Sequence, residues 1–327
     1  MSRAPAPHAL SACSSGHARD PAGGTAAAPA PIPPAAAFAY LLLAMMMTGA
    51  NLPIGKVVAG EMPVYIFTFF RFLVSCAALM LLVRVERGPT LRAMPPRRVV
   101  DLIGMALFGM IGYTVFMLEG VKRTAAGDAG IITATMPAVV AILGLLILRE
   151  RLRANQMVAV VLAVAGIAVI QVAGVSAGVS TLVGNVLVAA AVLCEALFVI
   201  LGKRLTPTYQ PIRLALGANL AGLVMAAPLA LSDVGATDLT AISPGVWALA
   251  TWYALSSSVF CLLLWYRGLP HVSTALAGLA TAAIPVTALA VSAMALGEPV
   301  GPEKLAGAAL VIAGIVIGAR ARPLRRR

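Results

Sequence analysis

The sequence contains few charged residues, and this scarcity argues against an ordinary soluble protein. Asp, Glu, Lys and Arg make up 11% of the 327 residues, and hydrophobic residues make up 61%, whereas a soluble domain has about 25% charged residues. Such a composition cannot cover a water-facing surface with charge in the usual way. We therefore expect most of the surface to contact lipid.

Residues and motifs for metal, nucleotide or covalent chemistry are also scarce. The four cysteines, Cys13, Cys76, Cys194 and Cys261, show no CxxC spacing and the three histidines are scattered, so neither a disulfide framework nor a zinc site is predicted. The stretch GANLPIGKV (49–57) has one residue too many between its glycines for a P-loop and no Ser or Thr after its lysine. No paired-carboxylate, HExxH or nucleophile-elbow pattern occurs. We expect no cofactor, no metal and no enzymatic activity.

The positive charge of the chain does not indicate nucleic-acid binding. Lys and Arg number 24 against 12 Asp and Glu, which gives a net charge of +12. These charges occupy short breaks between apolar runs and form no basic face that could follow a line of phosphates. They are typical of the cytoplasmic loops of a membrane protein.

The apolar runs predict ten transmembrane helices. A span needs about 20 largely apolar residues, and helices are favoured over strands because lipid offers backbone groups no hydrogen-bond partner. The expected spans are 36–58, 64–83, 100–119, 125–148, 155–173, 182–203, 211–231, 245–266, 272–296 and 303–320. Residues 1–35 are expected to form a disordered cytoplasmic tail rather than a signal peptide, and residues 321–327 a basic cytoplasmic tail.

The second half of the chain repeats the first. A shift of 148 residues brings Gly120–Val169 onto Gly268–Ile317 without a gap and aligns Pro137 with Pro285. Each repeat holds five spans, over 36–173 and 182–320. An odd number of spans makes the second repeat enter the membrane from the opposite side, so the sequence predicts two inverted five-helix repeats, a common build for secondary transporters.

The distribution of Lys and Arg predicts the orientation in the membrane. With the N-terminus in the cytoplasm, 19 of the 24 Lys and Arg residues lie on the cytoplasmic side, four lie outside and Arg71 lies within a span. Cytoplasmic loops carry such an excess of positive charge. We therefore expect a multi-pass protein of the inner membrane with both termini in the cytoplasm.

Two long motifs resemble a known family. The stretch from FMLEGVKRT to LLILRERL (116–152) and its copy from LLWYRGLP to LGEPV (263–300) are similar to the signature of EamA-type transporters of the drug/metabolite transporter superfamily, and FFRFL (69–73) also fits. The resemblance covers about residues 36–320. It implies ten helices, inverted repeats, cytoplasmic termini and the movement of small metabolites or drugs, usually outward. It does not specify the substrate.

Prolines and glycines in the fourth and ninth spans predict hinges. Pro137 and Pro285 fall near the middle of these spans, where proline removes a backbone hydrogen bond and kinks a helix. Gly130 and Gly278 precede them, each followed four residues later by alanine, and small residues let helices approach closely. We expect these two helices to cross near the pseudo-twofold axis and to line a central cavity. The alternative is that they only pack.

Glu195 is the leading candidate for function. It lies about eight residues from Lys203, which is roughly 12 Å of helix and close to the bilayer centre. A charge there costs about 3 kcal/mol or more unless it faces a polar cavity or a partner, and burial favours the neutral form of a carboxyl. Glu195 is therefore expected to bind substrate or to carry a coupling proton. The alternative is a structural carboxyl, protonated or paired on its own helix.

Four further residues complete the candidate substrate site. Arg71, about seven residues into the second span, could bind a substrate carboxylate through two hydrogen bonds, pair with Glu195, or extend to the membrane surface. Its repeat mate is Asn219. Asn51 and Trp252 are the remaining candidates. Trp252, Trp265, Tyr113 and Tyr253 could line the cavity or mark the membrane interfaces, and the sequence does not separate these roles.

Several residues at helix ends have simpler explanations. Asn51 and Pro53 lie one turn before Lys56 and could break the first helix beside the cavity. Lys56 and Lys203 end the first helix of each repeat, where extension of the side chain to the membrane surface is favoured over a role in gating. Glu150 and Glu298 lie at helix ends, where capping accounts for them without function.

The features together predict a secondary carrier that exports small amino-acid-like metabolites or drugs by alternating access. The energy would come from the substrate gradient or from proton exchange at Glu195. An importer or exchanger with the same fold remains an alternative, and so does a membrane scaffold that transports nothing. The expected partners are a small-molecule substrate and the lipid bilayer, not nucleic acid, and a homodimer is left open.

Overall fold

The computed structural model describes residues 32–86, 94–124, 126–172, 181–235, 237–297 and 300–320. Every regular element in these ranges is a helix, and ten helical stretches are long and apolar enough to cross a membrane, which confirms the expected fold class. Most of the two predicted tails lies outside the described residues. The main elements are α1 Pro34–Ala59, α2 Val64–Leu82, α3 Pro96–Ala106, η2 Leu107–Gly112, α4 Tyr113–Val121, α5 Ala126–Ala134, α6 Met136–Ile147, α7 Ala154–Val172, α8 Leu182–Leu205, α9 Pro211–Val234, α10 Pro244–Leu255, η4 Ser256–Phe260, α11 Cys261–Gly268, α12 Thr274–Thr281, α13 Ala283–Leu296 and α14 Pro302–Ala319.

Four of the ten spans are interrupted, and the interruptions correspond between the repeats. The third and eighth spans each contain a short π-helical stretch, η2 and η4. The fourth span breaks between α5 and α6, and the ninth breaks between α12 and α13. Pro137 and Pro285 lie in the first turn of the new helix, where a missing N–H removes no intrahelical bond. The predicted kinks are therefore present as helix breaks.

The first helix differs from the expectation. α1 continues without a break from Pro34 to Ala59, with Pro53 inside it. A proline in a membrane helix is tolerated where neighbouring helices and local adjustments satisfy the freed carbonyl. The prediction that Pro53 breaks this helix beside the cavity was wrong.

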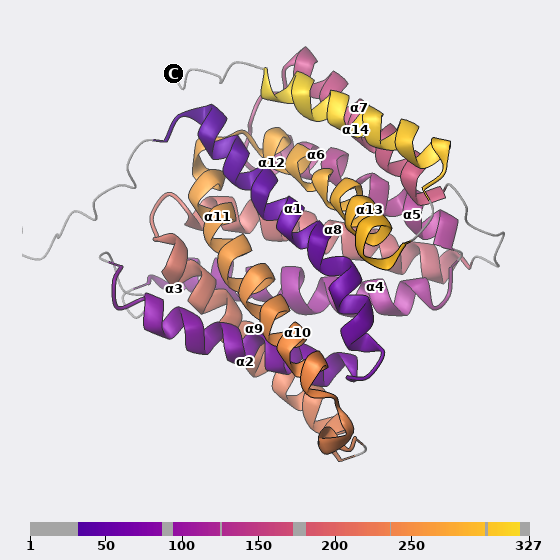
Figure 1. Ribbon diagram of the computed structural model, residues 1–327. Coiled ribbons are helices and arrows are strands. Elements are labelled where there is room, and N and C mark those ends of the chain that lie inside the picture. Colours follow the sequence, from indigo (N-terminus) through magenta and orange to yellow (C-terminus); the bar gives the residue numbers. More distant parts are fainter. Residues whose placement is uncertain are drawn as a thin grey trace, which may run out of the picture.

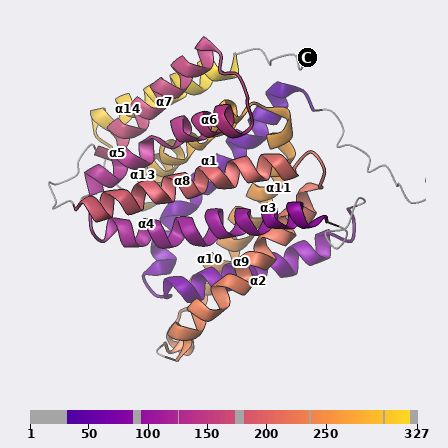
Figure 2. The same cartoon turned by 180° about the vertical axis from the view of Figure 1, so that it is seen from behind.

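The fifth and tenth spans show the internal symmetry directly. α7 and α14 lie along each other at one edge of the bundle (Figures 1 and 2). A Cβ on Gly166 would lie 2.6 Å from the carbonyl oxygen of Gly307, and a Cβ on Gly314 would lie 2.8 Å from that of Ala159. The shift of 148 residues converts each of these contacts into the other, and the helices run antiparallel. The pseudo-twofold axis therefore passes between α7 and α14 and relates two inverted repeats.

We expect Gly166→Ala to lower the melting temperature of the detergent-solubilised protein. The new methyl group has no room beside the Gly307 carbonyl oxygen, so α7 and α14 must separate, and overpacking of this kind costs about 1–3 kcal/mol. Gly235→Ala is the matched control, because nothing lies within 4 Å of a Cβ at that position. Equal melting temperatures for the two variants would contradict the close packing of α7 on α14.

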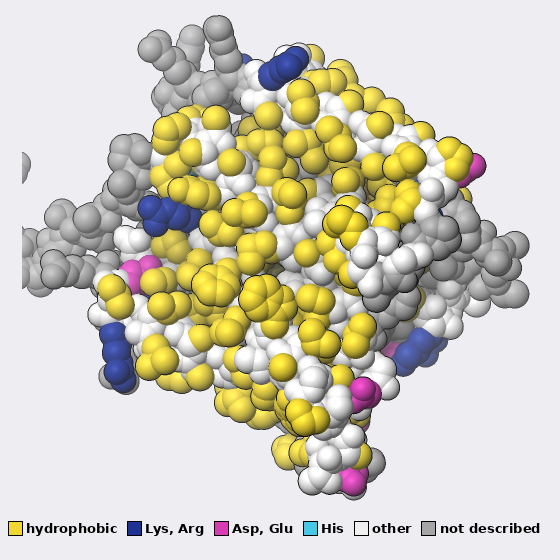
Figure 3. All heavy atoms as spheres, viewed as in Figure 1, with side chains coloured by type: hydrophobic (Ala, Val, Ile, Leu, Met, Phe, Trp, Pro, Cys, Tyr) yellow, Lys and Arg dark blue, Asp and Glu magenta, His cyan; other side chains and the backbone are white. Residues whose placement is uncertain are grey.

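The outer surface of the bundle is strongly apolar. Large hydrophobic side chains are exposed on separate spans, including Leu146 (67%), Val161 (66%) and Val224 (72%). Figure 3 shows hydrophobic side chains across the middle of one face, with Lys and Arg toward its margins. A soluble monomer rarely exposes so much apolar surface, so this surface is the one that contacts lipid.

The two ends of the bundle differ in charge. At the end that we call the basic end, α2, α6, α8, α11 and α14 finish and α1, α3, α7, α9 and α12 begin. Its described Lys and Arg residues are Arg84, Arg97, Arg98, Arg149, Arg151, Arg153, Lys203, Arg204, Arg213, Arg267 and Arg320. The opposite end has Lys122, Arg123 and Lys304, and Lys56 near the end of α1.

A carboxylate holds the start of α9 at the basic end. The two carboxylate oxygens of Glu86 accept hydrogen bonds from the backbone N–H groups of Ile212 and Arg213, each at 3.1 Å. Burial raises the pKa of Glu86, although these hydrogen bonds and the Arg213 guanidinium oppose that shift. The contact satisfies N–H groups that have no partner within the helix.

Candidate substrate site

Glu195 lies in α8 and faces a cluster of tyrosine and cysteine side chains. Tyr113 at the start of α4, and Cys261 and Tyr266 in α11, are close enough to interact with it electrostatically. The carboxylate makes no hydrogen bond or ion pair with any part of the chain that the structure describes, and the residue is not fully buried. Because an unpaired carboxylate at this depth needs a polar surrounding, the cluster is suited to meet water or a polar solute.

Arg71 lies in α2 and contacts α10 rather than Glu195. Its guanidinium is close enough to the Tyr253 side chain to interact with it electrostatically and lies 4.7 Å from the centre of the Phe72 ring, within the range of a cation–π contact. Its Nε is buried without a hydrogen-bond partner. Tyr253 is held in turn by an edge-to-face contact with Phe67, with 5.1 Å between ring centroids. No ion pair joins Arg71 and Glu195, so that alternative is not observed.

Two tyrosines link the positive and the negative side chain. Tyr113 interacts electrostatically with both Glu195 and Tyr253, and Tyr253 interacts electrostatically with Arg71. Electrostatic contacts therefore connect Arg71 to Glu195 through Tyr253 and Tyr113, and no ion pair joins the two charged side chains in the part of the chain that the structure describes. We call these four residues the charged array. Such an array can bind a solute that carries both a negative and a positive group.

The negative end of the charged array also lies near α1 of the first repeat. The hydroxyl of Thr48 in α1 lies 3.1 Å from the Cys261 Sγ, and Cys261 interacts with Glu195. Thr48 is the approximate repeat mate of Glu195. Thr48 of the first repeat and Glu195 of the second repeat are therefore both neighbours of Cys261.

Asn51 and Asn219 support the π-helical stretch η4. The Asn51 Oδ1 accepts a hydrogen bond of 3.1 Å from the Ser256 hydroxyl. The Asn219 Nδ2 donates to the Ala215 carbonyl at 2.8 Å and to the Ser258 carbonyl at 3.4 Å. Both asparagines are buried, at 2% and 0% exposure. The two asparagines therefore hold η4 in place, and residues that flank η4 belong to the site. The contacts of the asparagines themselves do not point to direct substrate binding.

Of the two neighbouring aromatic residues of α10 that could line the cavity, Tyr253 rather than Trp252 belongs to the site. Trp252 is 58% exposed and belongs to the apolar outer surface, whereas the next residue, Tyr253, contacts Arg71. Successive side chains of a helix point about 100° apart, so Trp252 and Tyr253 face different directions. Hydrophobic residues surround this span on all sides, and the sequence therefore does not show which side faces the site. Tyr266 was missed. The run from Ser256 to Ser258 was the available sign of an irregular helix.

Of the four predicted hinge residues, the two prolines lie just after the breaks in the fourth and ninth spans, and the two glycines lie within the helices that precede the breaks. The two glycines contact different helices. A Cβ on Gly278 would lie 3.0 Å from the Pro137 carbonyl oxygen and 2.9 Å from the Val140 Cβ, so α12 crosses α6 at this glycine. A Cβ on Gly130 would instead lie 2.6 Å from the Gln171 Cβ in α7. Pro285 lies in the first turn of α13 and is partly buried.

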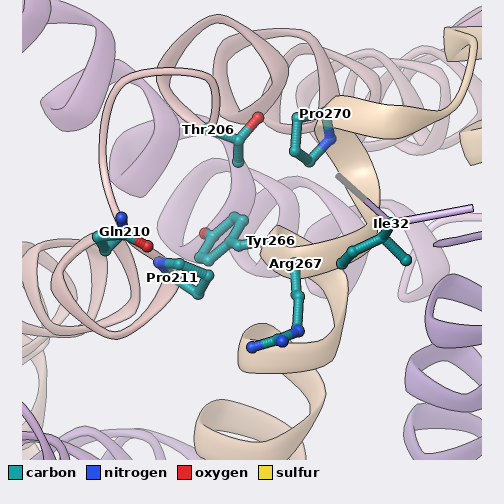
Figure 4. Close-up of a pocket in the computed structure, with 7 residues that line it drawn as sticks. All are labelled: Ile32, Thr206, Gln210, Pro211, Tyr266, Arg267 and Pro270. Atoms are coloured by element: carbon teal, nitrogen blue, oxygen red, sulfur yellow. The ribbon is translucent and has the colours of Figure 1, made fainter. Parts of the chain in front are cut away.

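A small pocket opens at the basic end. It is lined by Ile32, Thr206, Gln210, Pro211, Tyr266, Arg267 and Pro270, and Figure 4 shows the Tyr266 ring between these residues, next to the Arg267 side chain. Tyr266 is almost completely buried (1% exposed) and also interacts with Glu195. It therefore both lines this pocket and neighbours Glu195 of the charged array.

The family model described as EamA-like transporter family matches residues 35–172 and again residues 182–319. The chain belongs to the EamA-like transporter family. The two matches correspond to the two five-helix repeats of the structure, and the family is one of transporters.

Similar proteins agree with this assignment. The protein named Uncharacterized transporter YetK of Bacillus subtilis (strain 168) is 31% identical over 285 residues, which are 86% of each chain. A Probable terminal-alkyne amino-acid exporter of Streptantibioticus cattleyicolor is 29% identical over 244 residues, covering 74% of this EamA member and 81% of the exporter. One solved crystal structure, 18% identical, has a TM-score of 0.74 and covers 87% of this chain and 98% of its own, which supports the fold.

Proposed function

We propose that this EamA-family transporter is a secondary carrier that exports small amino-acid-like metabolites by alternating access. The observation that carries this proposal is the charged array, in which Arg71 and Glu195 lie in the interior with opposite charges that do not pair. Two uncompensated charges in an apolar bundle are unfavourable, and a solute with both a carboxylate and an ammonium group would compensate both at once. The family and the amino-acid exporter of Streptantibioticus cattleyicolor support the same substrate class.

The chemistry of binding follows from the two ends of the array. The Arg71 guanidinium presents a planar set of donors that suits a carboxylate, and the Glu195 carboxylate suits an ammonium group. The hydroxyls of Tyr253 and Tyr113 can accept or donate hydrogen bonds along the solute between them. A molecule with only one of the two charges would leave one buried charge unpaired, so the array selects against it.

The orientation of the carrier is part of the proposal. The excess of Lys and Arg at the basic end supports placing that end, with both termini, in the cytoplasm of a cell with an inner membrane. Export then moves a solute from the basic end to the opposite end. The two inverted repeats would rock about the axis between α7 and α14 and expose the charged array to one side at a time.

Proton exchange is the proposed source of energy. Glu195 is the only carboxylate in the cluster around the negative end, and it has no basic partner among the described residues. A carboxyl that binds a proton when the ammonium group leaves, and releases it when the next ammonium group binds, exchanges one proton for one substrate. The titratable groups that face it are Tyr113, Cys261 and Tyr266, and Cys194 precedes it on α8.

The test is counterflow in proteoliposomes. Purified protein is reconstituted with a labelled neutral amino acid inside, and unlabelled compounds are added outside. We expect a zwitterionic amino acid to drive exchange. Its amide, which lacks the carboxylate, and its N-acetyl derivative, which lacks the ammonium group, should each be at least about tenfold weaker, because a charge-assisted hydrogen bond contributes about 1.5–3 kcal/mol. Equal exchange with all three compounds would refute the two-charge site.

The direction of transport needs a separate measurement. Flux from inside-out vesicles, compared with flux from right-side-out vesicles under the same pH gradient, separates export from the alternative of import or exchange. A protein that moves no zwitterion, amine or acid in either preparation would instead agree with a membrane scaffold.

A further inference from the structure

The basic end of the bundle is tied together by an ion pair between the two repeats. One carboxylate oxygen of Glu150, just after α6, lies 2.6 Å from the Lys203 Nζ at the end of α8. The other accepts a 2.6 Å hydrogen bond from the backbone N–H of Thr274, the first residue of α12. Lys203 also donates to the Val272 carbonyl at 2.6 Å. Glu150 of the first repeat thus holds two separate helices of the second repeat.

The ion pair is largely removed from water. The Lys203 side chain is 8% exposed and that of Glu150 is 26% exposed. A lysine ammonium group donates three hydrogen bonds, and the carboxylate of Glu150, the carbonyl of Val272 and the hydroxyl of Thr274 accept them. Removal of one partner from such a pair leaves the other charge buried and uncompensated, which is strongly unfavourable. Lys203 therefore does not extend to the membrane surface, which was the favoured expectation.

The backbone before Glu150 is shaped to present it. Arg149 has φ of 54°, in the left-handed region, where a residue with a Cβ is strained. The backbone N–H of Glu150 then returns to the Gly144 carbonyl at 3.1 Å, which ends α6 and turns the chain toward α8 and α12. The repeat mate of Arg149 is Gly297, which has φ of 67°. The first repeat thus keeps the same turn although Arg149 is not a glycine. Backbone strain of this kind persists where it serves a function, and here it positions Glu150.

The two ends of the bundle are not in equivalent states. At the basic end α6 packs along α12, and a Cβ on Gly144 would lie 2.6 Å from the Thr274 Cβ. Within the described helices, the symmetry-related pair, α5 and α13, is not a packed pair. Gly130, the repeat mate of Gly278, contacts α7 instead. The crossing of the fourth and ninth spans is therefore closed toward the basic end and lacks its symmetric counterpart toward the opposite end.

We propose that Glu150 and Lys203 form an ionic lock that holds the carrier closed at the basic end and opens once in each transport cycle. This inference rests on the proposed alternating access. Opening exchanges the contacts of the lock for water, and closing restores them. Lys203 and Glu150 then set how much time the charged array spends accessible from the basic end, without touching the substrate.

Accessibility of a cysteine beside the charged array tests the lock. The native cysteines are replaced by serine and Thr48 by cysteine, and a membrane-impermeant maleimide is applied to each face of sealed vesicles. A reporter fused to the C-terminus, which follows α14, identifies the face of the basic end. We expect slow labelling from that face in the parent, and labelling about tenfold faster in Glu150→Gln and in Lys203→Gln, the change produced by a bias of about 1.4 kcal/mol.

A double variant and a neighbouring charge provide the controls. Glu150→Gln combined with Lys203→Gln should label no faster than the faster single variant, because the second change removes nothing once the pair is broken. The double variant also leaves no uncompensated charge, so it remains informative if a single variant fails to fold. Arg204→Gln removes the adjacent charge, which is 43% exposed and lies 3.6 Å from Asp101, and should leave labelling unchanged.

Three results would overturn the lock. The first is an unchanged labelling rate from the basic end in the double variant when that variant is present at normal membrane levels. The second is that the increases in labelling rate in the two single variants add up in the double variant. The third is that Arg204→Gln increases the labelling rate as much as the lock variants do. The assay needs no substrate, so its outcome is independent of whether the solute is a zwitterion. If the lock variants behave as expected and the counterflow test fails, the substrate class is wrong and the lock stands.

Discussion

Glu195→Gln is expected to abolish the dependence of transport on a pH gradient while the protein still folds. Glutamine has nearly the same shape as glutamate, but it neither binds a proton nor carries the negative charge that pairs with an ammonium group. No other carboxylate lies in the described surroundings of Glu195, where the titratable neighbours are Tyr113, Cys194, Cys261 and Tyr266. The loss of a charge-assisted contact should also weaken zwitterion binding by about 10- to 100-fold.

The measurement is flux of a zwitterionic amino acid in proteoliposomes with and without an imposed pH gradient. For exchange of a proton against an exported substrate, acid on the side of the opposite end should accelerate export in the parent and have no effect in Glu195→Gln. Glu119→Gln is the matched control, because Glu119 pairs at the bundle surface with Lys122 and Arg123 and should keep the response of the parent. An unaltered response in Glu195→Gln would remove this residue from the coupling.

Arg71→Lys is expected to raise the KM for a zwitterionic substrate by about 10- to 100-fold, the change for a loss of about 1.5–3 kcal/mol. Lysine keeps the positive charge but lacks the planar set of donors that binds both oxygens of a carboxylate. It would also alter the electrostatic contact that the guanidinium makes with Tyr253. The effect should be confined to substrates with a carboxylate, because only these use the Arg71 end of the charged array.

Transport of a labelled amino acid and of its amide separates a binding role of Arg71 from a structural one. In Arg71→Lys the amide should keep its parental KM, whereas the free amino acid should lose affinity. Arg204→Lys, at the exposed surface, is the control for a conservative change without a function. If both substrates lose the same affinity, Arg71 supports the fold of α2 against α10 and does not bind the carboxylate.

Helix number, duplication and inversion were readable from the chain because they depend on local properties. Apolar length sets whether a segment can span the bilayer, and an exact shift of 148 residues relates Pro137 to Pro285 wherever the helices lie in space. The distribution of Lys and Arg between the loops likewise indicates, from the sequence alone, that the second repeat is inverted. Glu195 and Arg71 stood out because a charge within an apolar span is unfavourable in any packing.

The partners of these residues depend on contacts between distant helices, which no local pattern encodes. Trp252 and Tyr253 are neighbours in a uniformly hydrophobic span, and only the packing of α10 on α2 directs the tyrosine toward Arg71 and leaves the tryptophan outside. Glu150 resembled a helix cap until α6, α8 and α12 were brought together around it. The tertiary structure alone shows which end is closed, because two inverted repeats of similar sequence can exchange roles, and their packing in one state breaks that equivalence.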